Sequence, residues 1–401
     1  MAEIERCSLS GDASPATDLI RDAAARQRSG AIQRLRERFP GWDPESSTLN
    51  LGLATPTLAS TSLDDGVLDG VSSAIDRYLA TGDLGERRAT LVSSRENRAH
   101  PIPPSIGTER STPNAGLNVD PFLGAEELLA GNTLNLNDAQ AHLGGRVQDL
   151  CDDLALAFVA HVQMNVYVSW GEAPGFGAHW DDHDVIVVPV AGAKYWTVDE
   201  PPALAPIKDV IPAGGTGKSV WSGVLSRGDA LMIPRGWPHH VAGLGEEVSV
   251  HLTASIRRPT ALDLLVHLPS ERFEREFELD DADLEHCLGS WASILTTEPR
   301  VGPIAATTAR LAGFAGHRMR AVMPGGAVFL DERADAEALE MATNNRTVRI
   351  PRSSAPALAE LLDGWRTVEE ISAATGSPRD DVVDLVERLG SVGIVQLESP
   401  A

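Results

Sequence analysis

Residues 184–198 read DVIVVPVAGAKYWTV, and this stretch decides the predicted fold. Both halves are rich in β-branched and aromatic residues, and Ala191-Gly192 between them is a pair expected in a tight hairpin turn. Further strands are predicted on both sides, at 162–170, 219–225, 229–233 and 247–256. Many short strands at this spacing predict a mainly β domain of the sandwich or jelly-roll type, and not a parallel α/β sheet.

Helices are predicted around these strands, because apolar residues recur there at helical spacing. They cover 15–39, 64–80, 146–160, 270–278, 281–297 and 303–320. A Pro-, Ser- and Asn-rich stretch at 94–120 predicts a loop. The chain end, 346–399, predicts three short helices and a strand, with Thr367 and Glu370 as a capping box on the second helix. That order of elements is typical of a winged helix.

These patterns divide the 401 residues into four predicted segments. A helical N-terminal region with a loop covers 1–120, and a jelly-roll domain covers 121–260. A helical region covers 261–345, and a winged-helix domain covers 346–401. A chain of this length is typical of two or three domains, which agrees with a division into several segments.

The composition restricts the partners and the compartment. A net charge of −23 argues against nucleic acid as the main partner and favours a basic protein. No apolar run approaches the ~18–20 residues of a membrane span, and the N-terminus has no signal-peptide pattern. The cysteines Cys7, Cys151 and Cys287 are too widely spaced for a disulfide framework or a zinc site. A cytoplasmic protein without a membrane partner is therefore expected.

The sequence His179-Trp180-Asp181 lies between a glycine-rich approach and a strongly β-forming run. In extended chain, residues i and i+2 point to the same side, so His179 and Asp181 can share one metal ion. Farther along the chain, a strand that ends in a turn presents His239 as a third ligand. Two histidines and one carboxylate on one face of an octahedron leave positions open for a co-substrate and O₂, as in non-haem Fe(II) oxygenases.

Other nearby patterns offer alternatives. His183 is spaced for a hydrogen bond near the metal and not for ligation, and His240 is expected to point away from the metal. His251 lies within a strand, where a buried core histidine is the commoner case and a role near the metal is the alternative. The stretch 214–219, GGTGKS, resembles a phosphate-binding loop, but Pro212 stands where its first glycine is required. A loop between strands is expected there.

A co-substrate such as 2-oxoglutarate needs a cation for its distal carboxylate, inside the barrel and within reach of the metal. Lys194 lies in a predicted strand and is one of only three lysines among 34 basic residues. Asn165 and Tyr167 alternate on the strand before the H-x-D motif, and Thr253 and Ser255 alternate on the last strand. These five residues are the candidate co-substrate contacts, and the alternative for Lys194 is a solvated strand position.

Several of these stretches together resemble the JmjC-type cupin hydroxylases, and specifically their ribosomal oxygenase branch. The matching stretches are 165–167 (NVY), 177–185 (GAHWDDHDV), 190–196 (VAGAKYW), 228–239 (GDALMIPRGWPH) and 249–253 (SVHLT). That branch has an H-Y-D-D-x-(D/E)-V-F core and a distal histidine turn. Trp180 stands where the family usually has tyrosine, and residues 1–120 do not resemble the family's N-terminal part.

The resemblance implies Fe(II) on His179, Asp181 and His239, and it implies that Lys194 binds the carboxylate of 2-oxoglutarate. For the architecture it implies a double-stranded β-helix (jelly roll) followed by a helical dimerisation region and a C-terminal winged helix. A 2-oxoglutarate-dependent dioxygenase that consumes O₂ and forms a homodimer is therefore expected.

The expected activity is hydroxylation of a side chain in a protein, with a basic ribosomal protein as the leading substrate. The unusual N-terminal region keeps open a tailoring hydroxylase of a peptide or peptidyl natural product. A protein demethylase is a further alternative, because hydroxylating an N-methyl carbon is the same net chemistry. A non-catalytic binding protein is another alternative. From Ser353 onward three arginines stand against nine acidic residues, so the winged helix is expected to contact protein and not DNA.

Overall fold

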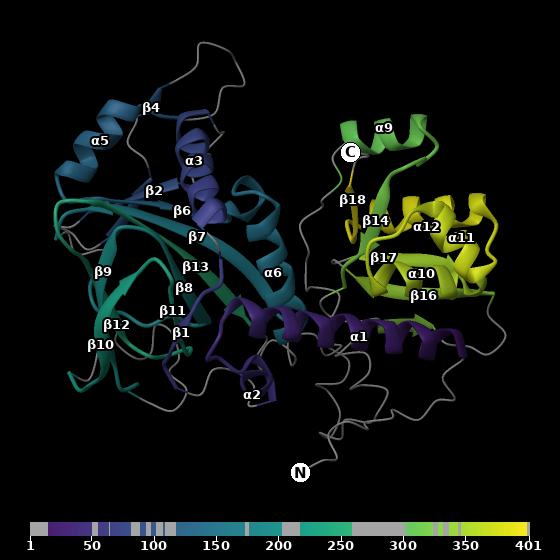
Figure 1. Cartoon of the computed structure of the whole chain (residues 1–401), viewed down its shortest axis with the longest axis horizontal. Helices are drawn as coiled ribbons and strands as arrows, with labels where there is room; N and C mark the ends of the chain where they lie inside the picture. Colours follow the sequence, from purple (N-terminus) through teal and green to yellow (C-terminus); the bar gives the residue numbers. More distant parts are fainter. Residues whose placement is uncertain are drawn as a thin grey trace, which may run out of the picture. The chain divides into compact units, whose positions relative to one another are not determined.

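The structure is a computed structural model, and its chain forms two compact units (Figure 1). The first, called the barrel unit, contains residues 32–154 and 162–257. The second, called the C-terminal unit, contains the residues up to 31, residues 155–161 and those from 258 onward. The residues that the structure describes are 15–49, 55–63, 65–81, 89–93, 98–101, 107–108, 118–172, 176–202, 217–258, 301, 303–323, 328–331, 337–343 and 346–398.

Two sheets built from antiparallel strand pairs form the barrel unit, so the predicted mainly β core is confirmed. The larger sheet has the order β1-β11-β8-β13-β7-β6-β2-β3, the smaller one has the order β10-β9-β12, and β4 pairs with β5 alone. The strands are β1 (Thr57–Ser60), β2 (Ala89–Ser93), β3 (Arg98–Pro101), β4 (Gly107–Thr108), β5 (Asn118–Val119), β6 (Thr133–Leu136), β7 (His161–Trp170), β8 (Asp184–Ala191), β9 (Ala193–Asp199), β10 (Ser219–Ser226), β11 (Asp229–Ile233), β12 (His239–Gly243) and β13 (Val248–Arg257).

Apolar side chains from both sheets fill the space between them. Val185 and Val187 of β8 pack with Trp196 and Val198 of β9 in one buried cluster. On β9 the buried residues are two apart, which is the strand period, whereas on β8 every residue from Asp184 to Val190 is buried. The core is therefore built from one face of β9 and from a strand, β8, that is buried on both faces.

Helices flank the sheets of the barrel unit (Figure 1). They are α2 (Pro44–Leu49), α3 (Asp65–Thr81), α5 (Pro121–Leu129) and the short 3-10 helix η2 (Ala139–His142). Two longer helices, α1 (Pro15–Arg38) and α6 (Gly145–Phe158), contribute residues to both units. The helices predicted at 15–39, 64–80 and 146–160 are thus confirmed to within two residues at each end.

The turn at Ala191-Gly192 corrects one prediction. The strands on its two sides do not pair with each other as a hairpin, because β8 lies in the larger sheet and β9 in the smaller one. Gly192 has φ +62°, and a Cβ at this position would lie 2.6 Å from the carbonyl oxygen of Val248. Glycine is therefore required both by the left-handed backbone and by the close approach, at the point where the chain crosses from one sheet to the other.

The predicted boundary near residue 120 is also corrected. Strands β1, β2 and β3 come from the segment expected to be helical and loop-like, yet all three belong to the larger sheet. β1 pairs with β11, and β2 pairs with β3 and β6. These strands are only four or five residues long, which is too short for a periodic pattern to mark them.

Short helices and two small sheets build the C-terminal unit. The sheets pair β14 with β18 and order the others β15-β16-β17. The elements are α9 (Pro303–Leu311), β14 (Arg318–Ala321), β15 (Val328–Asp331), β16 (Ala338–Thr343), β17 (Arg346–Pro351), the 3-10 helix η4 (Arg352–Ser354), α10 (Ala355–Asp363), α11 (Val368–Thr375), α12 (Arg379–Ser391) and β18 (Val395–Glu398). The three C-terminal helices and the final strand are as predicted, and Thr367 with Glu370 forms the predicted capping box.

The helix predicted at 303–320 is wrong in its second half. Helix α9 ends at Leu311, Gly313 and Phe314 adopt positive φ of 58° and 61°, and β14 begins at Arg318. Strands β15 and β16 also lie inside the segment predicted to be helical, 261–345. The helices predicted at 270–278 and 281–297 lie outside the described residues.

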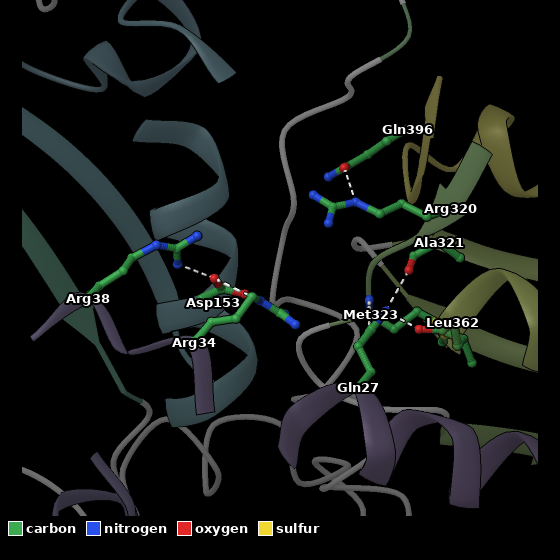
Figure 2. Close-up of polar contacts among 9 residues, drawn as sticks. All are labelled: Gln27, Arg34, Arg38, Asp153, Arg320, Ala321, Met323, Leu362 and Gln396. Carbon is green, nitrogen blue, oxygen red and sulfur yellow. Dashed lines mark hydrogen bonds and ion pairs between the residues drawn. The ribbon is translucent and has the colours of Figure 1, made fainter. Parts of the chain in front are cut away.

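Polar side chains fix α1 within each unit (Figure 2). In the C-terminal unit, the amide nitrogen of Gln27 donates to the carbonyl oxygens of Ala321 at 2.7 Å and Leu362 at 2.9 Å. In the barrel unit, Arg34 and Arg38 both bond to the carboxylate of Asp153 on α6, which is 4% exposed. Because the Asp153 carboxylate is buried, losing its arginine partners would leave a buried charge unpaired, so these bonds hold part of α1 in place within each unit. None of the described helices is long and apolar enough to span a bilayer.

Candidate metal centre and co-substrate cavity

Three side chains from two elements converge at one end of the space between the sheets. His179 and Asp181 precede β8, and His239 is the first residue of β12. The backbones of His179 and His239 exchange two hydrogen bonds, of 3.1 and 2.7 Å, which fix the two segments side by side. The ligand atoms of the three residues all lie within 4.8 Å of one another. The structure therefore brings together the three residues predicted to hold the metal.

Each histidine is held with Nε2 facing the carboxylate. Nδ1 of His179 donates to the carbonyl oxygen of Gly177 at 2.7 Å, and Nδ1 of His239 donates to that of Trp237 at 3.1 Å. Nε2 of the two rings then lies 4.0 and 3.7 Å from the carboxylate oxygens of Asp181. A bond from the far ring nitrogen fixes the tautomer that a metal ligand needs. This donor set fits a divalent metal such as Fe(II).

The turn before His239 is tied to the segment that carries the other ligands. The backbone N–H of Gly236 donates to the carbonyl oxygen of Asp181 at 2.9 Å. The backbone N–H of Arg235 donates to the buried carboxylate of Asp184 at 2.8 Å. These bonds position the turn, and with it His239, against the His-x-Asp segment.

The ionisation of the ligands suits a cation. Burial, together with the neighbouring His179, lowers the pKa of His239 to about 4. Burial pushes the pKa of Asp181 upward, but the imidazoles of His239 and His179 outweigh it and leave that pKa below its usual value. At neutral pH the site therefore holds a carboxylate and a neutral imidazole, which are the forms that bind metal.

A cavity of about 210 Å³ opens beside the three ligands. It is lined from both sheets by polar and apolar side chains. The lining residues are Thr133, Asn165, Tyr167, Ser169, Phe176, His179, Asp181, His183, Val185, Val187, Lys194, Trp196, His239, Val241, Gly243, His251, Thr253 and Ser255. All five residues predicted as co-substrate contacts are among them, so the structure places them around one space together with the metal ligands.

Lys194 is the cation of this cavity. It is 6% exposed, and burial lowers the pKa of its amine from 10.5 to about 7. Within the described part of the chain, no hydrogen bond or ion pair joins the amine to another residue. A buried amine in this state gains from an incoming anion, because an ion pair offsets the desolvation of its charge.

The other four predicted contacts lie on β7 and β13. The side-chain amide of Asn165 donates to the hydroxyl of Ser255 at 3.4 Å, which links the two strands. Tyr167 stacks on His251 with ring centroids 5.0 Å apart. Burial, with the negative charge of Asp181, raises the pKa of the Tyr167 phenol, so the hydroxyl stays protonated and able to donate.

The three alternative histidines take different places. His183 lines the cavity, and its Nδ1 lies 3.0 Å from a carboxylate oxygen of Asp182. His240 follows a ligand on β12 but is not part of the cavity lining, as the strand alternation predicts. His251 lines the cavity and does not belong to the metal-binding group. In the GGTGKS stretch, 214–216 lie outside the described residues, and Ser219 begins a strand and not a helix.

Sequence reasoning missed several lining residues. Thr133 belongs to β6, a four-residue strand without a recognisable pattern, so no sequence signal could have found it. Ser169 and Trp196 lie at even spacing from Tyr167 and Lys194, so strand alternation could have placed them inside.

A family model of the JmjC domain matches residues 141–264. This range contains the three candidate metal ligands, Lys194 and every strand from β7 to β13. The predicted resemblance to the JmjC-type cupins is thus confirmed over this range, and the strands and the cavity described above fit it.

Curated relatives and solved structures agree with this class. The bifunctional lysine-specific demethylase and histidyl-hydroxylase NO66 of Brugia malayi is 31% identical over 165 residues, which cover 39% of this chain and 23% of that protein. NO66 of Drosophila simulans is 32% identical over 136 residues, covering 33% and 16%. The chain thus spans less than a quarter of the length of these relatives. YcfD of E. coli shares the fold over 86% of this chain and 95% of its own, with a TM-score of 0.54 and 16% identity.

Proposed function

We propose that this chain is an Fe(II)- and 2-oxoglutarate-dependent dioxygenase that hydroxylates a side chain of a protein. The observation that carries the proposal is that two histidines and a carboxylate, whose ligand atoms lie within 4.8 Å of one another, share a small cavity with the buried amine of Lys194. The triad leaves coordination positions open, and the amine needs an anion. A dicarboxylate with one metal-chelating end satisfies both requirements.

The residues of the cavity would have different roles in the reaction. Iron with 2-oxoglutarate supplies, when bound, the oxidising chemistry that inserts oxygen into a C–H bond and leaves succinate and CO₂. His179 and His239 present Nε2 without reorienting, because backbone carbonyls already hold Nδ1. Lys194 would bind the distal carboxylate and so fix the direction of the co-substrate. The buried Val187 and Trp196 would exclude water from that part of the cavity.

The proposed substrate is a basic protein, with a ribosomal protein as the leading candidate. A net charge of −23 supports electrostatic attraction of such a partner. The names of similar proteins, ribosomal oxygenase for YcfD and histidyl-hydroxylase for NO66, support a polypeptide substrate. NO66 is also named a lysine-specific demethylase, which keeps demethylation as the alternative chemistry.

The remaining proposals concern assembly and location. The C-terminal helices α10, α11 and α12, with β18, support a winged helix, and its acidic surface supports a protein-contacting role. We also retain dimerisation through the segment 261–345 and a cytoplasmic location. Sedimentation of the protein at micromolar concentration would test the dimer, and a monomer there would contradict it.

Succinate formation tests the activity. Protein loaded with Fe(II) is incubated with 2-oxoglutarate and O₂, without further substrate, and succinate is measured. Wild type is expected to form succinate slowly, whereas His179→Ala and Lys194→Ala are expected to form none above background. His240→Ala and Lys218→Ala are the matched controls, because each replaces the same residue type outside the cavity, and both should behave as wild type. If the wild-type protein binds neither iron nor 2-oxoglutarate, the proposal is contradicted and the alternative of a non-catalytic binding protein is favoured.

Mass spectrometry tests the substrate. Ribosomal proteins from a deletion strain are compared with those of the parent, and a mass difference of one oxygen atom at a single residue is expected. If every site is unchanged, the ribosomal assignment fails while the oxygenase assignment stands. A loss of methyl groups in place of added oxygen would identify the demethylase alternative.

A further inference from the structure

His183 is a polar side chain of the cavity to which neither the metal nor the co-substrate assigns a role. It lines the cavity but does not belong to the group of residues that can hold the metal. It directly precedes β8, two residues after Asp181, whereas Lys194 lies beyond the other end of β8. His183 is therefore at the metal end of the cavity, away from the proposed site of the distal carboxylate of 2-oxoglutarate.

Two charged residues hold the imidazole of His183 from one side. Nδ1 of the ring donates to the carboxylate of Asp182 at 3.0 Å, and the guanidinium of Arg257 donates to the same carboxylate at 3.1 and 3.4 Å. Ile256 of β13 pairs with Asp184 of β8, so Arg257 and His183 are the next neighbours along the two strands. Asp182 and Arg257 do not line the cavity. The bonded edge of the ring therefore faces away from the cavity, and the opposite edge faces it.

The opposite edge of the ring carries Nε2, which has no hydrogen bond to any residue that the structure describes. Nε2 is also not among the buried atoms that lack a partner, and the side chain is 17% exposed, so a ligand can reach this atom. The bond that one ring nitrogen makes decides where the proton of the imidazole lies. With that proton on Nδ1, the neutral ring offers Nε2 as a hydrogen-bond acceptor.

We propose that His183 is a substrate-binding residue, whose Nε2 accepts a hydrogen bond from an N–H group on the side chain that is oxidised. The inference rests on the proposed function and deepens it, because it selects side chains that carry a donor near the reacting C–H bond. A site built to pair with a polar group rejects an analogue that lacks it, since the polar partner is then left unpaired. Amide, imidazole or guanidinium side chains are therefore expected, and purely aliphatic ones are disfavoured.

Binding of small probes to the loaded protein tests this inference. The protein is saturated with Mn(II) and 2-oxoglutarate, and paramagnetic Mn(II) broadens the NMR signals of a probe that binds beside it. The probes with a side-chain donor are the N-acetyl amides of histidine, arginine and asparagine, and the N-acetyl amide of leucine lacks one. In wild type, at least one donor probe should be broadened about two- to tenfold more than the leucine probe, which is the range expected from one hydrogen bond.

Two variants remove the acceptor and a third restores it. His183→Asn keeps an amide N–H near the place of Nδ1 for the bond to Asp182, but has no atom at the place of Nε2. His183→Phe removes both nitrogens, and in both variants the preference for the donor probe should be lost. His183→Gln carries an amide oxygen that reaches toward the place of Nε2 and should restore part of the preference. His240→Phe, the matched control, replaces a histidine outside the cavity lining and should keep the preference.

The contrary outcomes separate the inference from the function on which it rests. Mn(II) content and the dissociation constant of 2-oxoglutarate are measured first for every variant, so that probes are compared at equal occupancy. If wild type binds 2-oxoglutarate but prefers no donor probe, or if His183→Asn keeps the preference, the inference is overturned and the proposed function stands. His183→Asn decides alone if His183→Phe does not bind Mn(II). If wild type binds no 2-oxoglutarate, the proposed function itself has failed.

Discussion

The two ends of the cavity are built on opposite principles. At the metal end, the ring nitrogens that face away from the metal are bonded to the carbonyl oxygens of Gly177 and Trp237, and the adjoining turn is tied by Asp184. At the other end, Lys194 and His251 are buried without such bonds. The first end is organised by the protein itself, whereas the second is completed only by what binds to it.

This difference has an energetic consequence. At the metal end backbone carbonyls hold both imidazoles, so metal binding should require little reorganisation of these rings. The unpartnered end destabilises the free protein, since a buried charge without a partner is costly. An anion that relieves this cost should therefore stabilise the fold more strongly than its number of contacts suggests.

The largest effect is expected from removing a candidate metal ligand. Asp181→Ala removes the only carboxylate among the three candidate ligands and leaves two imidazoles. Fe(II) binding should be lost and succinate formation should fall to background, while the fold is kept because Asp181 faces the cavity. Metal content after gel filtration, measured beside a circular dichroism spectrum, checks both halves. A variant that retains iron and turnover would show that the cluster is not the metal site.

Lys194→Met sharpens the contrast between the ends, because stability and binding should change in opposite directions. The pKa of Lys194 falls from 10.5 to about 7 on folding, which at pH 7 corresponds to about 4 kcal/mol at most. Replacement by methionine should raise the free energy of unfolding toward that limit and weaken 2-oxoglutarate binding at least a hundredfold. The penalty is full below pH 7 and vanishes near pH 10.5, so the stabilisation should shrink as pH rises. Urea unfolding at pH 7 and pH 10 provides the check, and destabilisation at pH 7 would contradict it.

The dissociation constant of 2-oxoglutarate should depend on pH through the protonation of Lys194. Lys194 must be protonated to bind a carboxylate, and its pKa in the free protein is about 7. Below pH 7 the dissociation constant of 2-oxoglutarate should therefore be independent of this group, and above pH 7 it should rise by up to about tenfold per pH unit. Lys194→Arg supplies the control, because arginine stays charged and should remove the slope. Calorimetry from pH 6 to 9 measures it, and equal slopes in both proteins would argue against Lys194.

A smaller effect is expected from Asp184, which is not a metal ligand but holds the turn before His239. Asp184→Ala removes the acceptor for the backbone N–H of Arg235 and loosens the turn that carries His239. Metal affinity should fall about 10- to 100-fold, which is typical for partners that orient ligands. Competition with a fluorescent chelator measures this change. An unchanged affinity would mean that the paired backbones of His179 and His239 suffice.

The smallest effect is expected away from both ends. Lys218 forms an exposed ion pair with Glu200 at 2.5 Å. Exposed pairs contribute about 0–1 kcal/mol, so Lys218→Ala should leave turnover, metal binding and 2-oxoglutarate binding unchanged. Because the chain has only three lysines, this variant shows whether the effects at Lys194 come from its place and not from its residue type.

Much of the barrel could be predicted because its longer strands carry a local signal. β8 is rich in β-branched residues and β9 alternates at the strand period, and both are predicted to within one residue at each end. The short β1, β2 and β6 could not be predicted, because four or five residues give no period and their sheet partners are distant in sequence. The prediction of a hairpin at Gly192 is wrong because a turn sequence does not determine which sheet each of its two strands joins.

The sequence by itself determined the chemistry of this protein. The residue types and spacing of His179, Asp181 and His239 limit the metal and its geometry, and the scarcity of lysine singles out Lys194. Only the tertiary structure decided which polar groups meet: it buried Thr133 and His251 without partners around the same space as Lys194. The physical reason is that ligation depends on residue type and local direction, whereas burial and hydrogen-bond partners depend on segments that only folding brings together.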